Sequence, residues 1–174
     1  MEIEHLIKNE GKVSKFQKFM GVVSLIIFAD LLTKHLAVKF FAFKTVTIIP
    51  NFFDLTLVWN RGAAFGFLAS APEFVRKAVL IGASAIAAIA VIIYVYKNSQ
   101  KLSTVEFYSL ALIAGGAIGN LYDRFFIGAV RDFLDFYIGG YHWPAFNLAD
   151  SAISIGILGF VINEIFFKKR KSAE

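Results

Sequence analysis

Four long stretches of apolar residues, separated by polar segments, dominate this chain. They cover residues 19–41, 74–96, 105–121 and 146–167. Each is near the ~20 residues that a helix needs to cross the hydrocarbon of a bilayer. Hydrophobic residues make up 57% of the sequence, more than a soluble domain usually carries. We therefore expect an integral membrane protein, mainly α-helical, with four transmembrane helices in a single membrane domain over residues 1–174.

Basic residues gather outside the apolar stretches, at positions that would share one side of a membrane. Lys8 and Lys18 precede the first stretch, Lys97 and Lys101 lie between the second and third, and residues 168–171 follow the fourth. Because cytoplasmic loops are enriched in Lys and Arg, we expect both termini in the cytoplasm. The net charge of +5 is then a signal of topology, and we expect no nucleic-acid partner.

The two segments between stretches on the opposite, extracytoplasmic side differ in composition. In residues 43–72, two runs at 45–49 and 53–59 are rich in β-branched and aromatic residues and are separated by turn residues. Open sheet edges are not tolerated in hydrocarbon, so we expect a small β-rich platform outside the membrane. Residues 123–144 contain glycines and interfacial aromatic residues, and we expect an irregular loop there.

Polar side chains cluster where the third stretch ends and the fourth begins. Asn120, Asp123 and Arg124 are spaced to share one helical face. Asn147 and Asp150 fit a helix N-cap followed by an acid in the first turn, where the helix dipole favours negative charge. Helix packing and capping would explain either group taken alone.

The aspartates of this region should converge in space. Helices from the third and fourth stretches run antiparallel, so Asp123, Asp132 and Asp150 are expected at one depth on the extracytoplasmic side. Ionisable groups at membrane depth are costly and therefore indicate a function. Two carboxyl groups that share a proton can activate water and polarise a carbonyl, which is the chemistry of an aspartyl peptidase. Spacing alone leaves open whether Asp123 or Asp132 is the partner of Asp150.

Two further polar groups accompany these aspartates. Asp30 and Lys34 lie on one face of the first stretch in the favourable acid-first order, and we expect a buried ion pair. Asn60 and Gly62 follow the second predicted strand and suit a peptide-binding edge, because glycine permits close backbone approach. Cysteine is absent and the three histidines lie far apart, so we expect neither a metal nor a cofactor.

Five motifs occur in order between residues 30 and 151. They read DLLTK (30–34), NRGAAF (60–65), GGAIGNLYDR (115–124), VRDF (130–133) and FNLADS (146–151). With these motifs the chain resembles the bacterial lipoprotein signal peptidases, the type II signal peptidases. The resemblance implies a four-helix aspartyl peptidase of the bacterial cytoplasmic (inner) membrane, with its active site on the extracytoplasmic face.

The resemblance also implies a substrate and a set of site residues. The substrate is a prolipoprotein whose cysteine carries diacylglycerol, and a monomeric enzyme in contact with membrane lipid cuts just before that cysteine. Asp132 and Asp150 are the implied catalytic pair. Arg131 departs from the expected pattern, because an apolar residue is expected there. The implied supporting or substrate-binding residues are Asn60, Gly62, Asn120, Asp123, Arg124, Asn147, Asp30 and Lys34.

The two catalytic carboxyl groups should differ in protonation. Asp150 lies in a first helical turn, where the dipole favours the ionised form. Asp132 lies between Val130 and Phe133, where burial favours the neutral form. We therefore hypothesise that Asp150 is the base and Asp132 carries the shared proton; an arginine in contact with Asp132 would argue for the reverse.

Three other functions fit parts of the sequence. A small membrane transporter or proton relay would need polar residues through the membrane centre, whereas the second stretch is almost wholly apolar. A non-catalytic scaffold would tolerate Asp→Asn changes. A Ser/Lys peptidase that uses Lys34 has no serine in a persuasive partner position.

Overall fold

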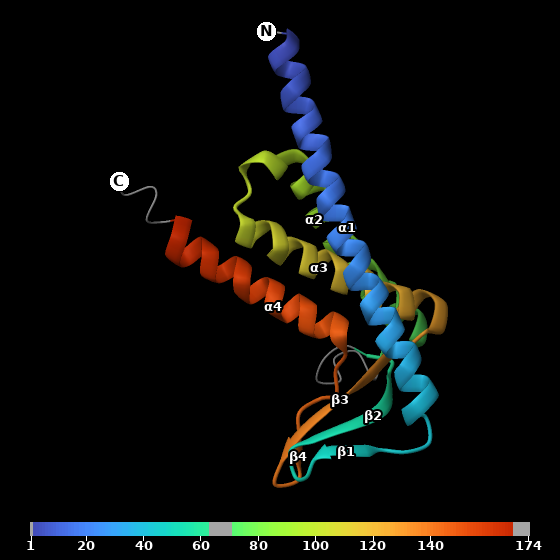
Figure 1. Cartoon of the computed structure of the whole chain (residues 1–174). Helices are drawn as coiled ribbons and strands as arrows, with labels where there is room; N and C mark the ends of the chain where they lie inside the picture. The colour runs from blue at the N-terminus through green and yellow to red at the C-terminus, as the bar shows by residue number, and fades with distance from the viewer. Residues whose placement is uncertain (1, 63–70, 169–174) are drawn as a thin grey trace.

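The computed structural model describes residues 2–62 and 71–168. Within these residues, four long helices stand on one small sheet (Figure 1). The helices are α1 (Glu2–Phe41), α2 (Glu73–Asn98), α3 (Thr104–Tyr122) and α4 (Leu148–Ile162). The helical segments long and apolar enough to cross a membrane are Gly11–Phe41, Glu73–Lys101, Thr104–Ile127 and Leu148–Phe166. The predicted fold class, four membrane helices with a small β-rich part, is confirmed.

Local sequence signals set the ends of α3. Ser103 caps its start: the Ser103 hydroxyl accepts from Glu106 N at 3.2 Å, and Glu106 Oε2 accepts from Ser103 N at 2.7 Å. This reciprocal pair is a capping box. Beyond α3 the chain makes a π-helical turn, Asp123–Ile127, which ends at Gly128 with a φ of 80°. Glycine takes this left-handed conformation without steric cost and so turns the chain toward the sheet.

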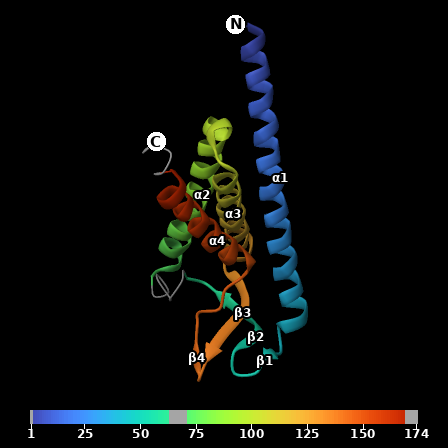
Figure 2. The same ribbon diagram turned by 60° about the vertical axis from the view of Figure 1, so that its left-hand side comes forward.

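Small residues let α3 pack closely against α1 and α4. Gly116 lies against the Ala149 carbonyl of α4, and Gly119 lies against the Asp30 carboxylate of α1. A Cβ at either glycine would overlap its neighbour. Figure 2 shows α3 beside α1, with the free end of α1 extending beyond the other helices. Close packing at small residues is the usual way that membrane helices associate.

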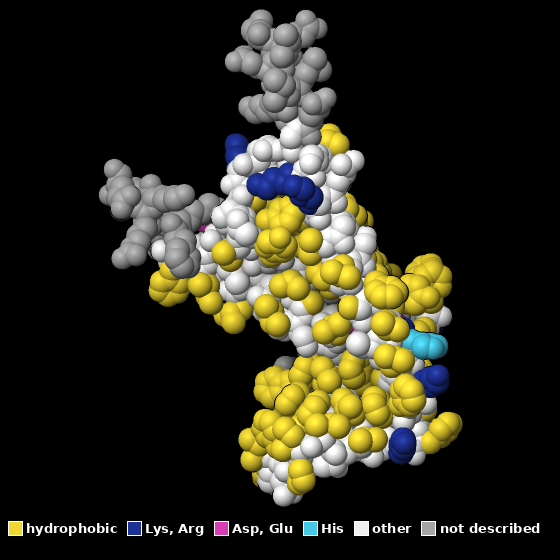
Figure 3. All heavy atoms as spheres, in the orientation of Figure 1, with side chains coloured by type: hydrophobic (Ala, Val, Ile, Leu, Met, Phe, Trp, Pro, Cys, Tyr) yellow, Lys and Arg dark blue, Asp and Glu magenta, His cyan; other side chains and the backbone are white. Residues whose placement is uncertain are grey.

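The outer surface of the helices is apolar. Large exposed hydrophobic side chains include Leu25, Phe28, Ile86, Ile155 and Leu158. Figure 3 shows hydrophobic side chains covering much of one face, over the helices and over the sheet. A broad exposed apolar surface is unfavourable in water but suits contact with lipid.

The sheet lies at the end of the bundle away from the start of α1 (Figure 1). Its strands are β1 (Val46–Ile49), β2 (Phe53–Asn60), β3 (Val130–Ile138) and β4 (Tyr141–His142), in that order and all antiparallel. The rings of Phe53 and Phe136 stack across β2 and β3 with centroids 4.4 Å apart. The two strands predicted from residues 45–49 and 53–59 are thereby confirmed.

The prediction of an irregular loop at residues 123–144 is wrong. This segment contains β3, a nine-residue strand paired along β2. The aspartates at 132 and 135 interrupt the hydrophobic pattern, so the strand is not visible locally. Strand formation depends strongly on tertiary context, and here pairing with β2 satisfies the β3 backbone.

Candidate active site

Asp132 lies in β3, directly across from Val58 of β2. It is 1% exposed. Its Oδ2 accepts from Asn60 Nδ2 at 2.9 Å, and its Oδ1 accepts from Asn147 Nδ2 at 2.7 Å. Two side-chain amides, one from the end of β2 and one from the start of α4, therefore fix the orientation of this carboxyl group.

Asp150 lies in the first turn of α4, and Asn147 is the N-cap, as the sequence suggested. Asn147 Oδ1 accepts from Asp150 N at 3.0 Å, and Asp150 Oδ2 accepts from Asn147 N at 3.3 Å. Asp150 Oδ1 also accepts from Asn120 Nδ2 at 2.7 Å. The capping box holds Asp150 near the positive end of the helix dipole.

A buried network lies behind the two aspartates. Asn120 Oδ1 accepts from Asn147 Nδ2 at 3.2 Å and from Lys34 Nζ at 2.9 Å. Lys34 also pairs with Asp30 at 2.8 Å, which confirms the predicted ion pair. Asp30 Oδ1 accepts from Ala149 N at 2.9 Å. Through these contacts α1 holds the start of α4 in place.

Asp123 is bound by Arg131 and does not share a cavity with Asp132 and Asp150. Arg131 binds it through Nη2 to Oδ1 at 2.6 Å and through Nε to Oδ2 at 3.1 Å. Asp123 is fully buried and does not line the cavity described below. Of the two candidate partners of Asp150, only Asp132 opens onto the same space as Asp150.

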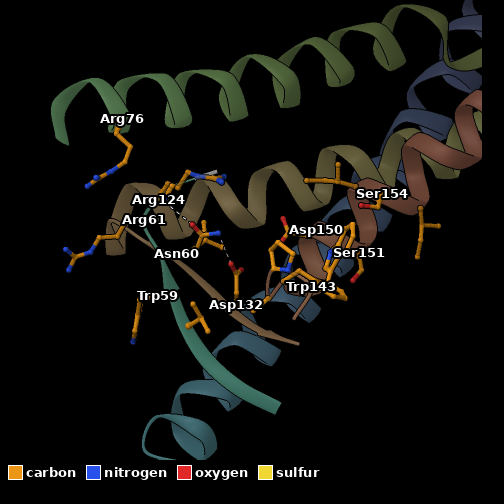
Figure 4. Close-up of a pocket in the computed structure, with 18 residues that line it drawn as sticks. Trp59, Asn60, Arg61, Arg76, Arg124, Asp132, Trp143, Asp150, Ser151 and Ser154 are labelled. Carbon is orange, nitrogen blue, oxygen red and sulfur yellow. Dashed lines mark hydrogen bonds between the residues drawn. The ribbon is translucent and has the colours of Figure 1, made fainter. Parts of the chain in front are cut away.

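A cavity of about 1230 Å³ lies beside Asp132 and Asp150. Figure 4 shows both side chains facing this space, with Asn60 hydrogen-bonded to Asp132. Of the residues predicted from the sequence, Asn60, Gly62, Arg124, Asp132 and Asp150 line the cavity. Asp30, Lys34, Asn120, Asp123 and Asn147 lie behind that lining and hold it in place.

Arginines and tryptophans add to the cavity wall. Arg124 is held by a 3.2 Å hydrogen bond from Nη1 to Ser84 Oγ of α2. Arg61, Arg76, Trp59 and Trp143 also line the cavity, with Arg61, Arg76 and Arg124 on one side of it (Figure 4). Trp59, Arg76, Trp143 and Ser84 are not among the site residues predicted from the sequence; for Ser84, a serine within the apolar run of α2 was the available signal.

Burial raises the pKa of Asp132 to about 7. The nearby Asp150 carboxylate adds to the rise, whereas the hydrogen bonds from Asn60 and Asn147 oppose it. A carboxyl group with this pKa keeps its proton close to neutrality, and a protonated carboxyl can donate to a substrate carbonyl. The Arg131 guanidinium binds Asp123, and Arg124 Nη1 donates to Ser84 Oγ, so these contacts do not argue for the reverse protonation.

The described part of the chain holds no group of three His, Cys, Asp or Glu side chains arranged for a metal ion. Residues 63–65 of the NRGAAF motif lie outside the described residues.

Comparison with known proteins finds relatives that share one name. A lipoprotein signal peptidase of Sulfurihydrogenibium sp. (strain YO3AOP1) is 57% identical over 157 residues, covering 90% of this chain and 96% of that protein. A lipoprotein signal peptidase of Francisella tularensis subsp. novicida (strain U112) is 45% identical, covering 88% of this chain and 94% of the relative. One of Burkholderia mallei (strain SAVP1) is 47% identical, with coverages of 84% and 87%.

Solved structures and a family model agree with these relatives. A bacterial membrane enzyme solved at 2.3 Å superposes with a TM-score of 0.75 at 27% identity, covering 89% of this chain and 92% of that one. A second bacterial membrane enzyme, solved at 1.9 Å, gives a TM-score of 0.74 at 25% identity, with coverages of 87% and 94%. The model of the family described as signal peptidase (SPase) II matches residues 22–166. The chain therefore belongs to the signal peptidase II family.

Proposed function

We propose that this protein is an aspartyl endopeptidase that removes the signal peptide from diacylglyceryl-modified prolipoproteins, with Asp132 and Asp150 as its catalytic pair. The observation that carries the assignment is their shared cavity, into which both carboxyl groups face, while Asn147 donates to Asp132 through Nδ2 and to Asp150 Oδ2 through its backbone N. Family membership favours this function over the transporter or proton relay.

The pair can divide the chemistry of peptide hydrolysis. Asp150, the ionised member, takes a proton from water, and that water attacks the scissile carbonyl. Asp132 keeps its proton because burial raises its pKa to about 7, and it donates a hydrogen bond to the carbonyl oxygen. When the intermediate collapses, the proton now on Asp150 passes to the leaving amine, and the peptide bond breaks.

The neighbouring polar groups support this cycle in different ways. Arg124 lines the cavity with a positive charge that can stabilise a developing oxyanion. Asn60 and Asn147 orient Asp132, and Asn120 orients Asp150. Gly62 leaves room for a substrate backbone at the cavity wall, and its amide is bound to Asn60 Oδ1 at 3.0 Å.

The apolar wall of the cavity suits a lipidated substrate. Phe146, Ile153 and Ile155 line it together with the two tryptophans. Ile155 is also exposed on the outer surface of α4, so the cavity continues toward the lipid-facing surface. Acyl chains of a diacylglyceryl group can lie there and contribute binding energy without specific polar contacts.

The basic residues support one orientation in the bacterial inner membrane. The start of α1 and the end of α4 lie away from the sheet (Figures 1 and 2). With the lysine-rich ends in the cytoplasm, the sheet and the two aspartates fall on the extracytoplasmic face. We place the enzyme there as a monomer with a single membrane domain over residues 1–174.

The direct test uses the purified protein in detergent or lipid with two forms of one prolipoprotein. The diacylglyceryl-modified form should be cut just before its lipidated cysteine, as read by mobility shift and mass spectrometry. The unmodified form should be cut far more slowly, because it lacks the acyl chains. Equal rates on both forms would remove lipid recognition from the proposal, and no cleavage of either would remove the peptidase assignment.

A further inference from the structure

Arg131 directly precedes Asp132 in the sequence and is buried, but it does not line the cavity. Its guanidinium holds Asp123 with two bonds, and Arg131 N donates a third to Asp123 Oδ2 at 3.0 Å. Bidentate arginine–carboxylate pairs are strong and geometrically specific. The start of β3 is thus clamped to the turn that follows α3.

Asp123 also faces the lysine behind the site. Lys34 Nζ lies 3.6 Å from Asp123 Oδ2, 2.8 Å from Asp30 Oδ2 and 2.9 Å from Asn120 Oδ1. Asp30, Lys34 and Asp123 are fully buried. Two acids, Asp30 and Asp123, are therefore balanced by two bases, Lys34 and Arg131. A buried cluster of this kind tolerates loss of one charge poorly, because the partner is left uncompensated.

The position of Lys34 decides how Asn120 is turned. A lysine ammonium only donates hydrogen bonds, so Asn120 presents its Oδ1 to Lys34. The Nδ2 of Asn120 then points the other way, where it donates to Asp150 Oδ1 at 2.7 Å. If Lys34 moved toward Asp123, Asn120 Oδ1 would lose its shorter bond, 2.9 Å from Lys34 Nζ, and keep only the 3.2 Å bond from Asn147 Nδ2.

We propose that Arg131 is a positioning residue: by neutralising Asp123 it keeps Lys34 on Asn120, and so fixes the donor that faces Asp150. This inference rests on the proposed function of Asp132 and Asp150. It assigns a role to the one residue of the motifs that departs from the expected family pattern. Arg131 acts through Asp123, Lys34 and Asn120 and touches no reacting atom.

The same arrangement sets the charge around the catalytic pair. Loss of the Arg131 charge adds one uncompensated negative charge behind the site and makes protonation of the pair easier. Loss of the Asp123 charge does the opposite. The charged groups that surround the pair are Asp30 and Lys34 from α1, Arg61 after β2, Arg76 from α2, Asp123 and Arg124 from the turn after α3, and Arg131 from β3.

Four variants test the proposal through the pH dependence of kcat for the lipidated substrate. Arg131→Gln should move the profile to higher pH by roughly half to one unit, and Asp123→Asn should move it to lower pH by a similar amount. The double variant Asp123→Asn/Arg131→Gln should return it close to the wild-type position. Arg131→Lys keeps the positive charge but cannot make the two-bond contact of the guanidinium with Asp123. Its kcat should therefore fall about tenfold, while the pH profile stays in place and KM changes little.

Lys77→Gln is the matched control. Lys77 pairs with Glu73 at 2.6 Å, the same separation as Arg131 Nη2 to Asp123 Oδ1, but the Lys77 side chain is 47% exposed. Removal of this solvent-screened charge should leave the profile in place. A shift equal to that of Arg131→Gln would show that the profile responds to any lost positive charge, and would overturn the proposal.

Two other results would overturn the inference. In the first, the single variants lose activity but their pH dependence does not shift, and the ion pair is then only structural. In the second, the pH profile of the double variant stays shifted from that of the wild type. If Arg131→Gln does not accumulate as folded protein, the pH profiles of Asp123→Asn and of the double variant still test the proposal: the first should be shifted to lower pH and the second should not. An inactive wild type, or an active Asp132→Asn, would instead contradict the peptidase assignment itself.

Discussion

Asn147 and Asp132 are joined by a 2.7 Å hydrogen bond that links the N-cap of α4 to β3. The same asparagine caps the turn that carries Asp150, through a 3.0 Å bond from Asp150 N. The helix cap and the catalytic geometry therefore depend on one side chain. A capping role and a catalytic role, which the sequence presents as alternatives, coincide at this position.

Replacement of Asn147 by serine should separate the two roles. Serine caps helices about as well as asparagine, so the N-cap of α4 should survive, and thermal stability in detergent should fall less than with Asn147→Ala. The donor to Asp132 is lost, however, and kcat should fall about tenfold or more. Asn147→Ala should lose the cap as well, which costs about 1 kcal/mol of stability. A serine variant with wild-type kcat would show that the bond to Asp132 is dispensable.

Asp132 should make stability depend on pH in a specific window. Its pKa rises from an ordinary 3.8 to about 7 on folding, so the folded state binds one more proton between these values. Stability therefore falls as pH rises through this window. Asp132→Asn removes the effect, so the free energy of unfolding of this variant relative to wild type should increase from pH 5 to pH 8, on the order of a few kcal/mol, and its melting temperature should rise relative to wild type over the same range.

A matched variant on the same strand controls this measurement. Asp135 lies three residues along β3 and pairs with His142 at the surface, at 2.9 Å. Asp135→Asn should not reproduce the trend seen with Asp132→Asn. A melting difference between Asp132→Asn and wild type that stays constant from pH 5 to pH 8 would contradict the raised pKa of Asp132.

Close packing at Gly119 should be intolerant of a methyl group. A Cβ there would overlap the Asp30 carboxylate, so Gly119→Ala should displace Asp30 from Lys34 and lower both thermal stability and kcat. Overpacked buried sites typically lose about 1–3 kcal/mol. Gly82→Ala in α2 is the control, because a Cβ there meets nothing within 4 Å and alanine favours helix. Equal behaviour of the two variants would contradict the packing role of Gly119.

The parts of the fold that are predictable from sequence are those encoded locally. The four apolar stretches and the N-cap Asn147 each follow from spacing or residue preference, and the structure has them. The Asp30–Lys34 pair is likewise visible as an i, i+4 pattern. The strands of the first platform segment are visible because β-branched and aromatic residues cluster there.

The parts that are not predictable depend on contacts between distant segments. β3 is a strand because β2 pairs with it, and its two aspartates conceal the pattern locally. The partner of Asp123 is Arg131, eight residues away, and that contact follows only once the turn and β3 are placed. Spacing therefore left Asp123 open as a partner for Asp150, whereas in the structure the Asp123 carboxylate is turned toward Arg131 and Lys34.

The most direct test of the catalytic pair is turnover of lipidated prolipoprotein by Asp132→Asn and by Asp150→Asn. Asparagine nearly preserves the shape of the side chain but can neither act as a general base nor share the proton. Both purified variants should fold and insert yet show no measurable cleavage, while Asp135→Asn cleaves at the wild-type rate and Asp123→Asn remains active with a shifted pH profile. Near-normal cleavage by either Asp132→Asn or Asp150→Asn would contradict the assignment of these two carboxyl groups as the catalytic pair.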